Sequence, residues 1–174
     1  DEDKLEAYKR LTKKDGRLHI YSHFGSDDPD VILGVIRYLA SACGCKVVFL
    51  DHITMVVTGR EQNDERRVLD ILSTQLAMMT LELDFCLVLV SHVNDEGQTR
   101  GSRNISKVAN MVVNLERDMV NPDPVIRNRT HVVVKKNRYS GRTGPAGVLQ
   151  FDPDTFRLTE LPKEDLDVES LIPF

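Results

Sequence analysis

Features that would place a protein in a membrane or outside the cytosol are missing or scarce in this sequence of 174 residues. No apolar run approaches the roughly 18 residues that a transmembrane helix needs. The first residues are charged and contain no apolar segment of the kind that signal peptides have. The cysteines are odd in number, stand in apolar surroundings and are predicted to be reduced thiols: Cys43, Cys45 and Cys86. We therefore predict a protein of the cytosol or a similar compartment, with no membrane partner.

An overall excess of positive charge is also missing, because the formal net charge is −4. Hydrophobic residues make up 41% of the chain, which is long enough to bury the core of one domain. Binding to nucleic acid would therefore depend on a local patch. Arg100, Arg103 and Lys107 form such a patch after a polar loop. A solvated loop of mixed charge is an equally good interpretation of these residues.

Apolar strands that alternate with amphipathic helices predict an α/β fold. Helices are expected at residues 5–11, 28–42 and 64–83, with a short one after the loop at 94–103. Strands are expected at residues 17–21, 46–51, 85–90 and 110–116. Because the inner strands are apolar throughout, they are typical of a parallel sheet that is covered on both faces. A hairpin at 131–151 and a last strand near 156–158 predict antiparallel strands at one edge.

Polar residues follow two of these strands at their carboxyl ends. Asp51 ends an apolar strand in the manner of a Walker B motif, in which the carboxylate holds Mg²⁺. Ser91 and His92 end the next strand and should lie at the same sheet edge, where ligands bind in open α/β sheets. A histidine there could contact a terminal phosphate. The alternatives are an aspartate that caps a turn and an ordinary surface histidine.

The hairpin contains two cations at alternate positions of one strand, Lys136 and Arg138. Side chains two apart in a strand point to the same face, where two cations repel each other. They are explained if they share an anion such as a triphosphate. A solvated basic hairpin tip explains them about as well.

The sequence contains no G-x-x-x-x-G-K-[ST] motif, the phosphate-binding P-loop that accompanies Walker B in nucleoside triphosphatases. Either the P-loop precedes Asp1 in a longer protein, or the chain is not a complete ATPase. We expect a partial domain over 1–160, truncated on its N-terminal side, and an acidic, mobile tail over 161–174.

Taken in order, several short motifs resemble the ring-shaped replicative DNA helicases, in particular the helicase half of the primase–helicases of short-tailed phages and their mitochondrial relative Twinkle. The match runs from about Leu18 to Leu158. It rests on Leu50-Asp51-His52-Ile53, Asp64-Glu65-Arg66-Arg67, Ser91-His92, Arg100-Gly101-Ser102, Leu115-Glu116-Arg117 and the hairpin. The resemblance implies a RecA-like ATPase core with a mainly parallel sheet flanked by helices.

The resemblance also implies roles for individual residues. Asp51 would be the Mg²⁺ ligand and His92 the phosphate sensor. Arg138 would be an arginine finger with Lys136 beside it, both reaching the ATP site of a neighbouring subunit. The nucleotide base would lie between a cation and an aromatic ring: Arg117 and Phe151.

The polar loop would line a central channel and hold single-stranded DNA, through Asn94, Arg100, Arg103 and Lys107. Three features depart from the family pattern. The loop carries Asp95 and Glu96 where the family is often rich in lysine, Lys107 stands in place of a glutamine, and Phe151 replaces a tyrosine.

The implied function is that of an ATP-driven, Mg²⁺-dependent hexameric DNA helicase in a phage-infected or bacterial cell, or in an organelle if the source is eukaryotic. The tail would dock a DNA polymerase or another replisome protein. The alternative is a C-terminal segment with no binding role. Without a P-loop the chain alone should lack ATPase activity. The alternatives are a RecA-like recombinase, a clock-type ATPase and a non-enzymatic scaffold subunit.

Overall fold

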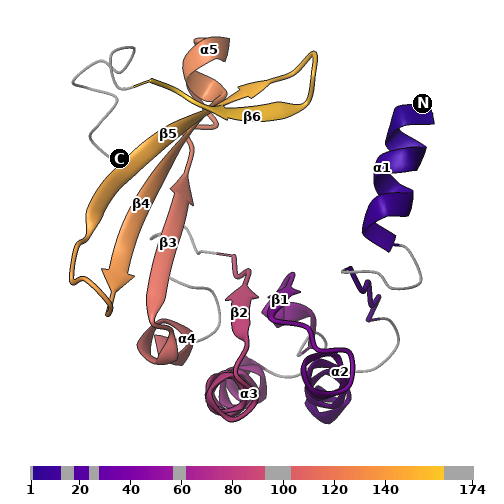
Figure 1. Cartoon of the computed structure of the whole chain (residues 1–174). Coiled ribbons are helices and arrows are strands. Elements are labelled where there is room, and N and C mark those ends of the chain that lie inside the picture. The colour runs from indigo at the N-terminus through magenta and orange to yellow at the C-terminus, as the bar shows by residue number, and fades with distance from the viewer. Residues whose placement is uncertain (1, 13–17, 24–27, 57–61, 93–102, 163–174) are drawn as a thin grey trace. The chain divides into compact units, whose positions relative to one another are not determined.

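The computed structural model describes residues 2–12, 18–23, 28–56, 62–92 and 103–162, in two compact units that meet between Val108 and Ala109. The first unit contains α1 (Glu2–Thr12), α2 (Pro29–Ser41), β1 (Val47–Leu50), the 3₁₀ helix η1 (Ile53–Val56), α3 (Gln62–Leu83), β2 (Cys86–Leu89) and α4 (Arg103–Val108). The second contains β3 (Met111–Glu116), α5 (Pro124–Arg127), β4 (Arg129–Asn137), β5 (Gly144–Asp152) and β6 (Arg157–Glu160) (Figure 1). No described helix is long and apolar enough to cross a bilayer.

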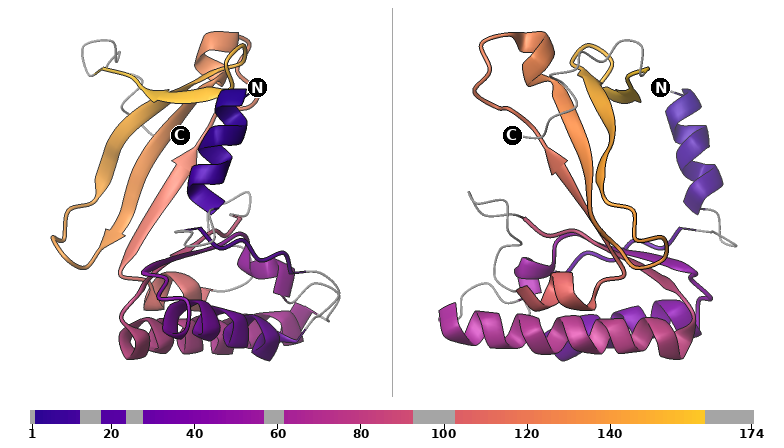
Figure 2. Two further views of the ribbon diagram at one scale, coloured as in Figure 1. Left: turned by 45° about the vertical axis from the view of Figure 1, so that its right-hand side comes forward. Right: turned by 90° about the vertical axis from the view of Figure 1, so that its left-hand side faces the viewer.

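In the first unit, β1 and β2 pair in parallel, with Val47 opposite Cys86 and Leu50 opposite Leu89. Helices α2 and α3 cover one face of this pair (Figures 1 and 2). Helix α2 begins as the sequence predicts, because the Asp28 carboxylate accepts a hydrogen bond from the Asp30 N–H at 2.9 Å. The fully buried side chains of the core are Ile36, Ile53, Val56, Leu69, Leu72 and Leu76.

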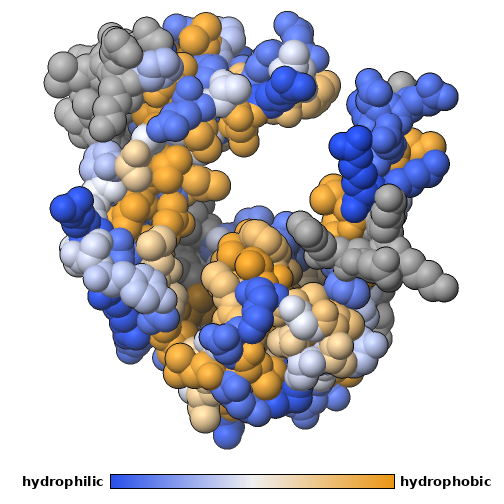
Figure 3. Space-filling model, in the orientation of Figure 1, coloured by the Kyte–Doolittle hydropathy of each residue, from blue (hydrophilic) through white to orange (hydrophobic). Residues whose placement is uncertain are grey.

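The opposite face of the parallel pair is exposed. Phe49 is 71% exposed, and Val47 and Val88 on the same face are exposed as well. Hydrophobic surface is visible over β1 and β2 (Figure 3). The prediction that these strands are buried on both faces is therefore wrong for this chain by itself. A strand that is apolar throughout is typical of a sheet covered on both faces. Among the described residues, only one face of this pair is covered.

The strand predicted at residues 17–21 is wrong within the part that is described, since residues 18–23 form no strand. A strand needs the hydrogen bonds of a neighbour, and apolar alternation alone does not provide them. This segment instead borders a cavity beside β1.

In the second unit, four strands form an antiparallel sheet in the order β3-β4-β5-β6. The pairing of β4 with β5 is the predicted hairpin, and its buried centre contains Val133 and Val148. The predicted α/β class, with parallel strands, flanking helices and an antiparallel hairpin, is confirmed, although the antiparallel part is larger than expected. The final strand begins at Arg157, so Phe156 lies in the turn before it.

Candidate nucleotide site

Two main-chain hydrogen bonds hold the carboxyl ends of β1 and β2 together. The Val90 N–H donates to the Leu50 carbonyl at 2.9 Å, and the Ile53 N–H donates to the Val90 carbonyl at 3.1 Å. Ile53 is completely buried, which fixes the chain immediately after Asp51 and His52. The structure therefore brings Asp51 and His92 to one sheet edge.

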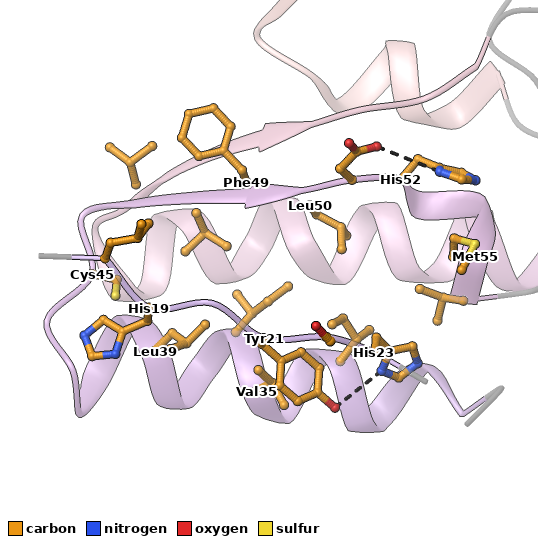
Figure 4. A pocket seen from close by; sticks show the side chains of 18 residues that line it. His19, Tyr21, His23, Val35, Leu39, Cys45, Phe49, Leu50, His52 and Met55 are labelled. Carbon is orange, nitrogen blue, oxygen red and sulfur yellow. Dashed lines mark hydrogen bonds and ion pairs between the residues drawn. The ribbon is translucent and has the colours of Figure 1, made fainter. Parts of the chain in front are cut away.

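His52 links these two residues, and sequence reasoning assigned it no role. Its ring packs edge-on against the ring of His92, with centroids 4.5 Å apart at an interplanar angle of 67°. The Nδ1 atom of His52 lies 3.8 Å from Asp51 Oδ1 (Figure 4). The His52 side chain is only 28% exposed, whereas that of Asp51 is 74% exposed. The Asp51 carboxylate is thus exposed to solvent, while the chain that follows it is fixed by the buried Ile53.

An exposed carboxylate at this edge suits Mg²⁺, which takes one or two carboxylates and completes its shell with phosphate oxygens and water. The described residues contain no cluster of three or more histidine, cysteine or acidic side chains that could hold a metal alone. Asp51 therefore fits a Mg²⁺ ion that arrives with a phosphate ligand, and does not fit a metal cage made by protein alone.

A cavity of about 460 Å³ lies between β1, α2 and residues 18–23. Figure 4 shows His23 and His52 at one end and His19 and Cys45 at the other. Burial raises the pKa of the Cys45 thiol, and neighbouring Cys43 raises it further. Both thiols are free, as predicted, and a raised pKa makes Cys45 a weak nucleophile.

In the second unit, β4 ends at Asn137, so Arg138 begins the turn and does not continue the strand of Lys136 as predicted. Asn137 holds this turn. The Asn137 side-chain oxygen accepts hydrogen bonds from the N–H groups of Tyr139 at 3.0 Å and Ser140 at 3.2 Å. Gly141 follows with a φ of 70°, a conformation that favours glycine. The Arg138 N–H donates to the Asn110 carbonyl at 2.9 Å, so its main chain is tied to the residue that precedes β3.

Lys136 and Arg138 are close enough for their charges to interact. Partial burial lowers the pKa of Lys136, and the positive charge of Arg138 lowers it further. The neighbouring Lys135 forms an ion pair, with its Nζ 2.9 Å from Glu116 Oε1. The two adjacent lysines of β4 therefore differ: the pKa of Lys136 is lowered, and the charge of Lys135 faces a carboxylate.

The lowered pKa of Lys136 leads to a prediction for the stability of the chain. Because the pKa of Lys136 is lower in the folded chain than in the unfolded chain, its charge opposes folding at neutral pH. This penalty is complete below the folded-state pKa and disappears as the pH rises through it toward the unfolded value. Lys136→Met should therefore raise the urea midpoint at pH 7, and the gain should shrink above the folded-state pKa.

Lys135→Met is the matched control for this prediction. It removes the cation that faces Glu116, so it should lower the urea midpoint at pH 7. If Lys136→Met destabilises the chain as much as Lys135→Met does, the charge of Lys136 favours folding, and the interpretation drawn from its lowered pKa is wrong.

Arg117 and Phe151 are both anchored on Asn128, the residue that ends α5. Arg117 donates from Nε to the Arg127 carbonyl at 2.6 Å and from Nη2 to Asn128 Oδ1 at 2.7 Å. The Phe151 N–H donates to the Asn128 carbonyl at 2.9 Å. The guanidinium of Arg117 and the main chain of Phe151 thus both bind Asn128, a residue that no pattern in the sequence indicates.

Most of the predicted DNA contacts lie outside the described residues. This applies to Asn94, Arg100 and the side chain of Arg103, whereas Lys107 is exposed in the last turn of α4. Helix α4 itself is anchored on α3. Ile105 is buried in the core, and Asn104 Nδ2 lies 2.9 Å from the Asp70 carbonyl and 3.0 Å from Thr74 Oγ1.

Comparison with known proteins first concerns the fold. No protein-family model matches the sequence. A solved structure of a DnaB-like replicative helicase, described together with its interactions with primase, has a TM-score of 0.66 with this chain at 19% identity. It covers 83% of this chain and 37% of that one. The two therefore share a fold.

The sequence match is more specific. A protein of Enterobacteria phage T3 described as a DNA helicase/primase is 30% identical over 155 residues, which is 81% of this chain. The chain spans 27% of the length of that relative. The resemblance to phage-type replicative helicases that the sequence predicts is thereby confirmed.

Proposed function

We propose that this chain is part of an ATP-dependent hexameric replicative DNA helicase, which moves along single-stranded DNA and separates the duplex. The observation that carries the proposal is the group of Asp51, His52 and His92 at one edge of the parallel pair. It has the composition that a phosphate-sensing edge needs, an exposed carboxylate beside a supported imidazole. The likeness to a phage helicase/primase supports the same interpretation.

In this proposal the two units supply different groups. Asp51 binds Mg²⁺ together with the phosphates of ATP, and His92 contacts the terminal phosphate. Mg²⁺, when bound, neutralises charge on the phosphoryl group that is transferred. Arg138 places a guanidinium on that group in a neighbouring subunit, with Lys136 beside it, while Arg117 and Phe151 hold the base.

The location of His92 suggests how the nucleotide bound at the ATP site could affect the binding of DNA. His92 precedes the segment 93–102, which is proposed to hold single-stranded DNA with Lys107 beyond it. The ring of His92 packs on His52, and His52 is fixed by the buried Ile53. A terminal phosphate that binds His92 therefore acts on a residue with a rigid support. Helix α4, which begins after the segment 93–102, is itself anchored by Asn104 and Ile105.

The experiment is a comparison of DNA reactions by the whole natural protein in the presence of Mg²⁺ and ATP. We expect release of the displaced strand from forked duplex DNA and ATP hydrolysis that single-stranded DNA stimulates. Pairing of homologous strands without unwinding would instead favour a recombinase. No nucleotide hydrolysis at all would favour a scaffold subunit and would overturn the proposal.

A further inference from the structure

Phe156 is a large aromatic residue in an unfavourable position by two measures. Its side chain is 82% exposed, and its φ is +56°, in the left-handed region. A bulky residue with positive φ is a real outlier, and such strain concentrates at ligand-binding positions. In a turn between two strands, glycine or asparagine would adopt a positive φ without strain and without exposing apolar surface.

The turn between β5 and β6 holds Phe156 in place. The Asp152 carboxylate accepts hydrogen bonds from the Asp154 N–H at 2.9 Å and from the Thr155 hydroxyl at 2.6 Å. These bonds lower the pKa of Asp152, with the Thr155 hydroxyl as the main cause. The carboxylate is therefore charged at neutral pH and keeps both hydrogen bonds within the turn.

The ring of Phe156 meets the ring of Phe151, with centroids 6.3 Å apart and planes at 69°. Two rings at this angle form a corner, in which a flat ligand can stack on one ring and touch the other with its edge. Phe151 is half-buried and linked through its N–H to Asn128, which also binds Arg117. The corner and the cation are thus tied to the same residue.

We infer that Phe156 is a specificity-determining residue of the nucleobase subsite, the second aromatic wall beside Phe151. This inference rests on the proposed function, because it assigns a ligand to the proposed nucleotide site. A heteroaromatic base matches the surfaces: it is flat, it stacks on a phenyl ring, and its π face accepts a guanidinium. An apolar protein partner would match Phe156 and gain nothing from Arg117.

The test replaces Phe156 with glycine in the whole natural protein. Glycine removes the ring and also relieves the positive φ, so the fold should be retained or slightly stabilised. We expect the KM for ATP to rise roughly tenfold, the usual scale for loss of an aromatic contact to a base, with kcat changed less than about twofold. Inorganic tripolyphosphate, which has no base, should inhibit the variant and the wild type equally.

Two further variants separate binding from structure. Phe156→Tyr keeps the ring and should keep the wild-type KM. Met119→Ala removes another exposed apolar side chain of the same unit and should leave the KM unchanged. An unchanged KM in Phe156→Gly, or an equal loss of ATP and tripolyphosphate binding, overturns the inference while the proposed function stands. A wild-type protein that binds no nucleotide overturns both.

Discussion

Replacing Arg138 with alanine in the whole natural protein should reduce the DNA-stimulated ATPase rate by about 10³-fold or more, while the affinity for ATP changes little. The expected size is that of the loss of an arginine finger in other phosphoryl-transfer enzymes, ~10³ to 10⁵ in rate. The finger stabilises charge that develops in the transition state, so its loss lowers kcat and spares binding. Steady-state ATPase assays together with equilibrium binding of a fluorescent ATP analogue measure both quantities.

The chain provides a matched control for this prediction in the same turn. Arg142 is also exposed and lies four residues further on, beyond Gly141. Arg142→Ala removes the same charge and should retain most of the activity. Arg138→Lys should remain defective, because an ammonium lacks the planar fork of a guanidinium. Near-normal turnover by Arg138→Ala would show that the hairpin is only a solvated basic tip.

The longer elements could be predicted from the sequence because their periodicity is strong. The helices predicted at residues 28–42 and 64–83 correspond closely to α2 and α3. The segment at 18–23 and the exposed Phe49 are different cases. Residues 18–23 and the strand that contains Phe49 both have the apolar pattern of a covered sheet. Whether they are covered depends on contacts with distant parts of the sequence, which a local pattern does not show. Local pattern gives the type of an element, and its partners decide its burial.

The candidate site divides in the same way. A Walker B pattern and two cations at alternate positions can be recognised in the sequence, because chemistry and spacing are both visible there. The contacts that support them cannot. His52 acquires a role only when parallel pairing brings it against His92, and Asn128 only when α5 ends beside Arg117 and Phe151. Phe156 was predicted to open a strand, and its positive φ comes from the turn that Asp152 closes.

Replacing Asp51 with asparagine should reduce Mg²⁺-dependent ATP turnover by roughly 10³-fold, because the ion loses its charged ligand and with it several kcal/mol of transition-state stabilisation. Asparagine keeps the shape of the side chain, which is exposed, so stability should change little. Asp84→Asn is the control. Asp84 is also exposed and precedes β2, at the opposite edge of the same parallel pair, where its carboxylate forms an ion pair with Lys46 at 3.3 Å. Its turnover should equal that of the wild type.

Asp51 and Arg138 together test whether one active site is shared between subunits. Each variant alone should have little activity, but if the proposed ring forms, a subunit with Asp51→Asn in a mixed ring still carries an intact Arg138. If that arginine serves the neighbouring site, a subunit with Arg138→Ala beside it regains a complete set of groups. Mixing the two variants should then restore part of the ATPase rate, with a maximum near equal proportions. Restoration cannot occur if each subunit uses its own Arg138, because every site in the mixture then lacks one of the two groups.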